Sequence, residues 1–221
     1  TEINKNTEKI NFKVVKMWGN TPSELQFDTY VQLYKNDKKE REQVKLTAND
    51  KWETSFEGMP KYDEDGKEIT YTVKEVNDNG VVEDNEKLTL QGYEYSVKHN
   101  PDNTGYKDTI TNTVTNASKK TFTAKVTKKW EDGVSTNSVK FTFTNKKYPK
   151  NKHTLTIGPN EGNEWNGNIE LPKYNDDISE AEYTVDEVKV PGFTTTGDKD
   201  KIVSYNNPSV EFTNKRDEKK I

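Results

Sequence analysis

Two lysines in this sequence stand where a β-strand would turn them toward an apolar interior. Lys16 follows Val14 at a spacing of two residues, and Lys128 follows Val126 at the same spacing. Residues two apart in a strand share one face. A buried ammonium group either finds a counter-charge or loses its proton, and the neutral amine of a lysine is a nucleophile. Both lysines are therefore candidates for covalent chemistry.

One glutamate and one asparagine in each half of the chain obey the same alternation. Glu75 and Glu187 each close a run in which a tyrosine and a valine share their face. Asn112 and Asn214 each follow an apolar side chain at a spacing of two. Strand parity thus directs one lysine, one glutamate and one asparagine into each interior.

Two interpretations of this set remain open from the residues alone. In the first, lysine and glutamate form a buried ion pair to which the asparagine bonds, an arrangement that proteins tolerate. In the second, the neutral amine attacks the asparagine carboxamide, releases ammonia and leaves an amide cross-link. The glutamate, kept protonated by its apolar surroundings, would polarise the carboxamide and relay protons to the leaving group. This chemistry needs no histidine, metal or cofactor, and none is expected.

The candidate residues belong to four segments that occur twice in the same order. The first copies are residues 12–18, 59–63, 69–76 and 110–113, and the second copies are 124–130, 171–175, 181–188 and 212–215. Four blocks in one order predict a tandem duplication. We expect a first domain at 1–116 and a second at 117–221, with the short polar segment 116–120 as their junction.

Each copy consists of short strand-like runs. In the first copy they are 10–18, 28–35, 42–47, 51–57, 69–76, 92–98 and 107–113. Turn-forming residues separate them, and no long stretch has the 3.6-residue periodicity of an amphipathic helix. Seven short antiparallel strands predict a β-sandwich. The predicted fold class is therefore all-β, with two sandwiches in tandem.

The composition indicates a folded chain with a polar surface. Charged residues make up 33% and hydrophobic residues 29%, while 11 Tyr, 8 Phe and 4 Trp supply large core side chains. The net charge of -4, with both signs interspersed, gives no basic face for nucleic acid. Without cysteine, neither a disulfide nor a thiolate zinc site can form. No apolar run suits membrane insertion and no secretion signal begins the sequence, so an exported form would be a fragment of a longer chain.

The repeated segments resemble the B-type repeat domains of the collagen adhesin family on Gram-positive cell walls. The resemblance rests on Lys-x-Trp, Pro-Lys-Tyr-Asp, Tyr-Thr-Val-Lys-Glu and Ile-Thr-Asn-Thr in this order, and it covers nearly the whole chain. In the second copy, Phe-Thr-Asn-Lys at 212–215 replaces Ile-Thr-Asn-Thr. The resemblance implies two sandwiches of inverse immunoglobulin or prealbumin-like type, each with an intramolecular isopeptide bond. The implied lysine, asparagine and promoting acid are Lys16, Asn112 and Glu75 in the first domain, and Lys128, Asn214 and Glu187 in the second.

The function implied by the resemblance is a structural stalk module of an adhesin or pilus-like protein. Such a module would be extracellular, anchored to the cell wall and part of a larger surface protein. It would not be an enzyme, since each site reacts once with itself. Each lysine lies near the start of its domain and each asparagine near the end, so tension could pass through the bond. In the chain-entropy picture, closing such a loop also removes about 4 to 5 kcal/mol of denatured-state freedom.

A ligand-binding adhesin module is the alternative, with a host matrix protein or a glycan held on loops. Segment 77–91, rich in Asn, Asp and Glu and longer in the first copy, is its candidate site, although a solvated insertion is the favoured interpretation. A carbohydrate-active enzyme would need paired carboxylates at an open cleft. Glu75 and Glu187 occupy inward positions in different domains, which argues against such an enzyme.

Two weaker signals concern metals and histidine chemistry. Residues 63–68 faintly resemble a calcium loop but lack the full ligand series, so a plain acidic turn is favoured. His99 and His153 have no counterparts between the copies, and we expect both to be exposed. A hydrolase site is therefore not predicted.

Overall fold

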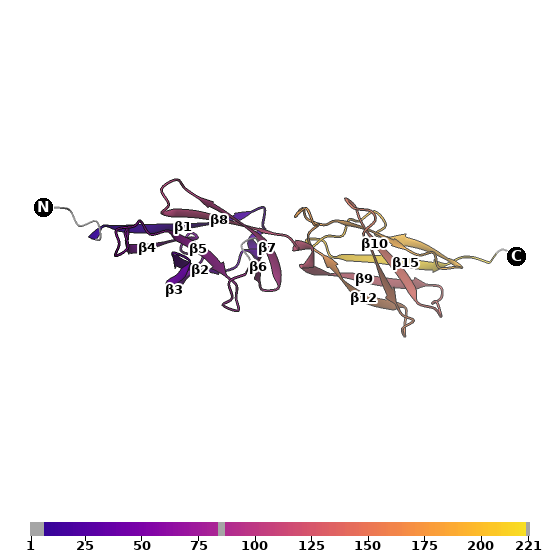
Figure 1. Cartoon of the computed structure of the whole chain (residues 1–221). Helices are drawn as coiled ribbons and strands as arrows, with labels where there is room; N and C mark the ends of the chain where they lie inside the picture. Colours follow the sequence, from indigo (N-terminus) through magenta and orange to yellow (C-terminus); the bar gives the residue numbers. More distant parts are fainter. Residues whose placement is uncertain (1–6, 84–86, 220–221) are drawn as a thin grey trace. The chain divides into compact units, whose positions relative to one another are not determined.

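The computed structural model describes residues 7–83 and 87–219, which are almost entirely β-sheet. The chain forms two compact units, Thr1–Ala117 and Ser118–Ile221 (Figure 1). Helical structure in the described residues is limited to short 3₁₀ turns such as η2 (Ser23–Leu25) and η3 (Ala117–Lys119). No helix of the described residues has the length and apolar character to cross a membrane. The all-β fold predicted from alternation is confirmed.

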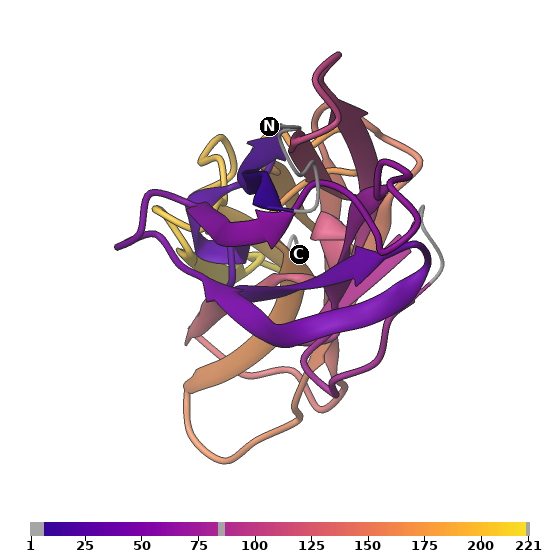
Figure 2. The same ribbon diagram turned by 60° about the vertical axis from the view of Figure 1, so that its left-hand side comes forward.

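The first unit consists of two sheets. Its strands are β1 (Lys9–Gly19), β2 (Thr29–Lys35), β3 (Lys38–Leu46), β4 (Glu53–Pro60), β5 (Tyr71–Val76), β6 (Lys87–Leu90), β7 (Tyr93–Pro101) and β8 (Lys107–Val114). One sheet has the order β4-β1-β8-β7-β6, and the other has the order β3-β2-β5. Figure 2 shows the pronounced twist of these strands, drawn in indigo and purple.

The second unit repeats this plan. Its strands are β9 (Thr121–Glu131), β10 (Val139–Asn145), β11 (Lys152–Ile157), β12 (Glu164–Pro172), β13 (Tyr183–Glu187), β14 (Phe193–Gly197) and β15 (Ser209–Arg216). They form the sheets β12-β9-β15-β14 and β11-β10-β13. Alternating burial along β9 and β15 places their apolar faces against the other sheet, as in a β-sandwich.

The prediction of purely antiparallel strands is wrong at one pair in each unit. β1 pairs with β8, and β9 pairs with β15, in the parallel direction. Parallel neighbours require a long connection, and here the whole intervening domain supplies it. The first and last strands of each unit therefore lie side by side.

The strand β6 was not predicted, because it lies in the acidic segment 77–91. Leu88 and Leu90, two residues apart, are nonetheless buried at 1% exposure each, and β6 pairs with β7 in antiparallel register. Two leucines at strand spacing were the available signal. They were too short a run to outweigh the polar residues around them.

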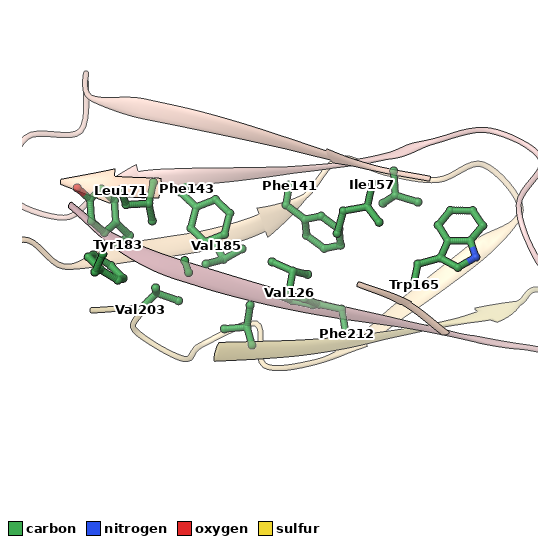
Figure 3. Close-up of a cluster of buried hydrophobic side chains, with 14 of the residues drawn as sticks. Val126, Phe141, Phe143, Ile157, Trp165, Leu171, Tyr183, Val185, Val203 and Phe212 are labelled. Atoms are coloured by element: carbon green, nitrogen blue, oxygen red, sulfur yellow. The ribbon is translucent and has the colours of Figure 1, made fainter. Parts of the chain in front are cut away.

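Aromatic side chains fill much of the core of the second unit. Figure 3 shows them in a row, with Trp165 at one end and Tyr183 beside Leu171 at the other. Phe141 and Phe212 lie between them, with ring centroids 5.4 Å apart. A chain with few hydrophobic residues thus gains its buried area from large ones.

Candidate functional site

The first site lies between the two sheets of the first unit. Lys16 on β1 and Asn112 on β8 belong to one sheet, while Glu75 on β5 belongs to the other. The parallel register sets Lys16 opposite Ile110 and Trp18 opposite Asn112. Lys16 and Asn112 therefore share a face and stand diagonally across neighbouring strands. The structure brings together all three side chains that the alternation directed inward.

The glutamate bridges the other two side chains in this site. Asn112 Nδ2 donates a hydrogen bond of 2.6 Å to Glu75 Oε2, and Lys16 Nζ lies 3.3 Å from Glu75 Oε1. Lys16 also donates to the Met17 carbonyl oxygen at 3.5 Å. The exposed fractions of Lys16, Glu75 and Asn112 are 3%, 6% and 0%. The amine and the carboxamide thus meet at one buried carboxyl group.

The second site repeats this arrangement with a closer lysine contact. Lys128 on β9 stands opposite Phe212 of β15, and Asn214 of the same strand stands opposite Trp130. Lys128 Nζ donates to Glu187 Oε2 at 2.7 Å, and Asn214 Nδ2 donates to Glu187 Oε1 at 2.6 Å. The side chain of Glu187 is only 2% exposed. Both copies therefore hold the same three groups in the same order.

An aromatic ring lies beside each amine. Lys16 Nζ lies 3.9 Å from the centroid of the Trp18 ring, and Lys128 Nζ lies 5.1 Å from that of Trp130. A second tryptophan packs edge-on against each ring, namely Trp52 at 5.4 Å and Trp165 at 5.0 Å. These rings limit the access of water to the amine and its acid.

The second tryptophans were missed by the sequence reasoning, although a signal existed. Trp52 and Trp165 are 113 residues apart, close to the 112 that separates the first three repeated blocks. Neither belongs to a block in which several residues recur, so the spacing alone does not single them out.

Burial changes the acid–base behaviour of both lysines. It lowers the pKa of Lys16 to about 8, against the opposing charge and hydrogen bond of Glu75. Burial also lowers the pKa of Lys128, against the opposing hydrogen bond and charge of Glu187. A lowered pKa increases the fraction of neutral amine, which is the nucleophilic form.

Each site also contains at least one buried oxygen atom to which no group of the described residues donates a hydrogen bond. Within residues 7–83 and 87–219, these atoms are Asn112 Oδ1 and Asn214 Oδ1, together with Glu75 Oε1, which has only the ion-pair contact with Lys16. Such atoms are uncommon in folded proteins because desolvation is not repaid. The carboxamide oxygen is also the atom on which negative charge develops when an amine attacks. A hydrogen-bond donor that reaches this oxygen during the reaction would therefore stabilise the transition state.

The remaining candidates from the sequence lie elsewhere. Asp63 Oδ1 accepts the backbone N–H groups of Asp65 and Lys67, as expected of a plain turn, and no metal-binding group of three or more His, Cys, Asp or Glu occurs in the residues that the structure describes. In segment 77–91, the turn is closed by Asn77 Oδ1, which accepts the N–H of Val81. Residues 84–86 of that segment lie outside the described residues.

The prediction that both histidines are exposed is wrong. His99 is half-buried, with Nδ1 2.6 Å from Oδ2 of the buried Asp108. His153 is half-buried and packs edge-on against Tyr183 at 6.0 Å. The long-range partners of both residues, in β8 and β13, left no local trace in the sequence.

Comparison with known proteins gives one family. The profile of the Cna protein B-type domain matches residues 12–117 and 124–214. A search of curated proteins gave no significant match.

Solved structures with similar folds come from bacterial surface proteins. The chain is 26% identical to a single B repeat unit (B1) of the collagen-binding surface protein Cna of Staphylococcus aureus, covering 96% of this chain and 100% of that one with a TM-score of 0.36. The two-repeat structure B1B2 of the same protein is 24% identical to this chain, with 95% of this chain and 50% of that one covered and a TM-score of 0.33. The pilus adhesin SpaC of Lactobacillus rhamnosus GG in its open conformation is 14% identical, with 95% of this chain and 29% of that one covered and a TM-score of 0.34. This chain thus spans half of the two-repeat structure and less than a third of SpaC.

The lowered pKa of Lys16 makes the pH dependence of an amine–carboxamide reaction diagnostic. If Glu75 must supply a proton, the active form is the Lys16–Glu75 pair with one shared proton. That proton is lost as the pH rises through about 8. The rate of ammonia loss from freshly folded, unlinked chain should then be flat just below this pH and fall about tenfold per pH unit above it.

For the measurement, the chain is isolated in an unfolded and unlinked form and is then folded at different pH values. Its intact mass is followed over time at each pH. A Lys128→Met variant restricts the reaction to the first domain. A rate that instead rises through pH 8 to a plateau would show that the neutral amine alone matters and that Glu75 donates no proton.

Proposed function

Because the chain belongs to the Cna protein B-type domain family, we propose that it is a structural stalk module of a surface adhesin or pilus-like protein, with a Lys–Asn isopeptide bond in each domain. The proposed bonds join Lys16 to Asn112 and Lys128 to Asn214. The observation that carries the proposal is the recurrence of a buried lysine, glutamate and asparagine cluster in two domains of one chain. We assign the domains to residues 1–116 and 117–221.

The proposed reaction balances without a cofactor. The neutral lysine Nζ attacks the asparagine Cγ, and a tetrahedral intermediate forms whose oxygen takes the negative charge. The glutamate, protonated at the start, gives its proton to Nδ2, and the resulting carboxylate then takes a proton from Nζ. The Cγ–Nδ2 bond breaks, ammonia leaves and a secondary amide remains. One C–N bond forms and one breaks, and each domain reacts only once.

Several features of the sites support this reaction over a permanent ion pair. The lowered lysine pKa favours the nucleophilic amine. In both sites the glutamate contacts Nζ and Nδ2 with its two oxygens, which is the position required of a proton relay. An ion pair would instead keep two charges in an apolar site at a lasting desolvation cost. Converting the amine and carboxamide into one neutral amide removes that cost.

The position of the bonds suits a load-bearing role. In the first domain, Lys16 lies on the first strand and Asn112 on the last, and these strands are neighbours. A bond between them places residues 17–111 in a closed loop outside the path of tension. The same holds for Lys128 and Asn214 in the second domain. Force thus crosses each domain through covalent bonds and leaves the intervening strands unloaded.

The family supports a proposal for the surroundings of such a module, and the names of the similar solved structures agree with it. Those structures are of a collagen-binding surface protein and a pilus adhesin. We place this chain outside the cell, anchored to the wall as part of a larger surface protein. Each cross-linking site reacts once with itself, so we do not propose an enzyme with turnover.

The intact mass of the purified chain tests the proposal directly. Two bonds should lower the mass by two molecules of ammonia relative to the sequence. Peptide mapping should then yield two branched peptides, one per domain. A mass equal to that of the unmodified sequence would exclude the cross-links and leave the buried ion pair as the correct interpretation.

The role of the acid is tested by Glu75→Gln, which preserves side-chain size but cannot relay a proton in the same way. The variant should fold yet lack the first bond, so its mass deficit should fall to one ammonia. Its first domain should also lose the roughly 4 to 5 kcal/mol attributed to loop closure.

Two controls accompany this variant. The second domain remains linked and serves as an internal reference, and Glu57→Ala removes an exposed glutamate of β4 that should have no effect. A Glu75→Gln chain that retains both mass losses would transfer the promoting role to another group.

Mechanical stretching tests the stalk function separately from the chemistry. Pulled at its termini, the linked protein should extend little beyond its terminal segments and junction. Lys16→Met should release residues 17–111, which adds roughly 300 Å of contour length. Lys128→Met should release the corresponding loop of the second domain. Full-length extension of the linked, unsubstituted protein would contradict the load-bearing role even if the bonds are present.

A further inference from the structure

The second domain carries an open hollow of about 1070 Å³ to which Lys128, Glu187 and Asn214 do not contribute. Its walls are the connection between β10 and β11, residues 146–151, and the segment between β12 and β13, residues 173–182. Six of its fifteen lining residues carry rings, namely Tyr148, Tyr174, Tyr183, His153, Pro149 and Pro172. The stalk role requires no such surface.

A buried pair of amides braces the two walls. Asn145 and Asn175 are only 3% and 5% exposed, and Asn145 Nδ2 donates to Asn175 Oδ1 at 2.7 Å. Asn145 Oδ1 accepts the backbone N–H groups of Lys147 and Tyr148, each at 3.0 Å. The connection is thereby tied to the opposite segment, and the hollow is formed in advance of any ligand.

Tyr148 presents a fixed and exposed ring in this hollow. Its hydroxyl donates to Asp177 Oδ2 at 2.7 Å, while the residue remains 39% exposed. Lys147 and Ser179 also donate to Asp177. Hydrogen bonds from Lys147, Ser179 and Tyr148 hold the pKa of Asp177 well below its usual range, so the carboxylate remains an acceptor. The ring therefore contributes contact area at little further entropic cost.

The neighbouring loop holds a strained residue. Ile178 has a φ of 74°, which is unfavourable for a β-branched side chain. Such strain persists only where the surroundings enforce it, and it is concentrated at ligand-binding and other functional segments.

The first domain shares this turn, with Gly66 at a φ of 78° in the position of Ile178, but it lacks the longer connection that forms the other wall of the hollow. There the connection between β2 and β3 is the two-residue turn Asn36–Asp37, whereas residues 146–151 join β10 and β11. The position that closes the strand is Lys35 in the first domain and Asn145 in the second. The shared scaffold therefore does not require the hollow, and unshared loops are where recognition sites occur.

The chemistry of the lining selects a class of ligand. Three lysines, at 147, 150 and 152, and two aspartates, at 176 and 177, nearly balance, and one lysine is already paired with Asp177. No strong field of one sign favours a highly charged ligand. Flat rings beside amides, hydroxyls and carboxylates suit a molecule with an apolar face and a polar edge. A pyranose ring has both, through its C–H face and its hydroxyl groups.

We propose that this hollow binds a neutral oligosaccharide, with Tyr148 as the stacking platform and Asp176 and Asn151 on the rim as hydrogen-bonding residues. This site is independent of the cross-links, so either proposal can fail without the other. A proline-rich peptide would also stack on tyrosine rings, but it offers few donors to the carboxylates and amides of the rim.

The test is titration of the full chain with chitotriose, maltotriose and N-acetyllactosamine, followed by amide chemical shifts in NMR. At least one saccharide at millimolar concentration should cause saturable shifts confined to residues 146–153 and 172–178. Tyr148→Ala should weaken that binding about tenfold, as expected for loss of a central aromatic contact. Tyr148→Phe should retain most of it, because the ring remains.

Tyr205→Ala is the matched control, since Tyr205 is 51% exposed but does not line the hollow. Amide spectra of each variant report whether the domain is still folded. The proposal is overturned if none of the three saccharides produces saturable shifts. Unchanged affinity in folded Tyr148→Ala, or binding of a proline decamer at this site in place of every saccharide, would also overturn it.

Discussion

The parallel pairing of the first and last strands is the constraint on which each domain depends. A lysine two residues before a tryptophan on the first strand can meet an asparagine on the last strand only if these strands are neighbours in this register. The glutamate must then come from the facing sheet. The site is therefore assembled by the closure of the sandwich, and no local segment contains it.

This assembly explains why the interiors tolerate three polar side chains each. Every such group costs free energy unless a partner compensates for lost water. The glutamate partners both the amine and the carboxamide, while the aromatic rings limit competition from solvent. No group in the described part of the chain donates to the carboxamide oxygens, so the hydrogen-bonding capacity of the unlinked cluster is satisfied only in part. The carboxamide oxygen, which lacks a hydrogen bond, is also the atom on which negative charge develops in the proposed reaction. Such an arrangement is typical of sites organised to stabilise a transition state.

Much of the site could be predicted from the sequence because strand parity has a period of two, which fixes the face of each side chain once the strand is recognised. The duplication then provided independent support, since Lys16 and Lys128 stand in matching contexts. Contacts between segments without repeated counterparts could not be obtained in this way. The parallel direction of β1 and β8, the packing of Trp52 on Trp18 and the pairing of His99 with Asp108 all depend on where the chain returns after long intervals. The alternation of side chains within one strand contains no information on which distant segment will lie beside it.

In the second domain, the residues that recur in the first domain and the residues that do not recur have different proposed roles. Lys128, Glu187 and Asn214 lie on strands whose sequences recur in the first domain, and changes there would disturb packing as well as chemistry. The braced connection at 146–151 lies on the surface and has no equivalent of its length in the first domain. If a covalent bond already holds the first and last strands together, the stability of the domain depends less on its loops. A cross-linked sandwich can therefore accept insertions that carry recognition without weakening the scaffold that bears the load.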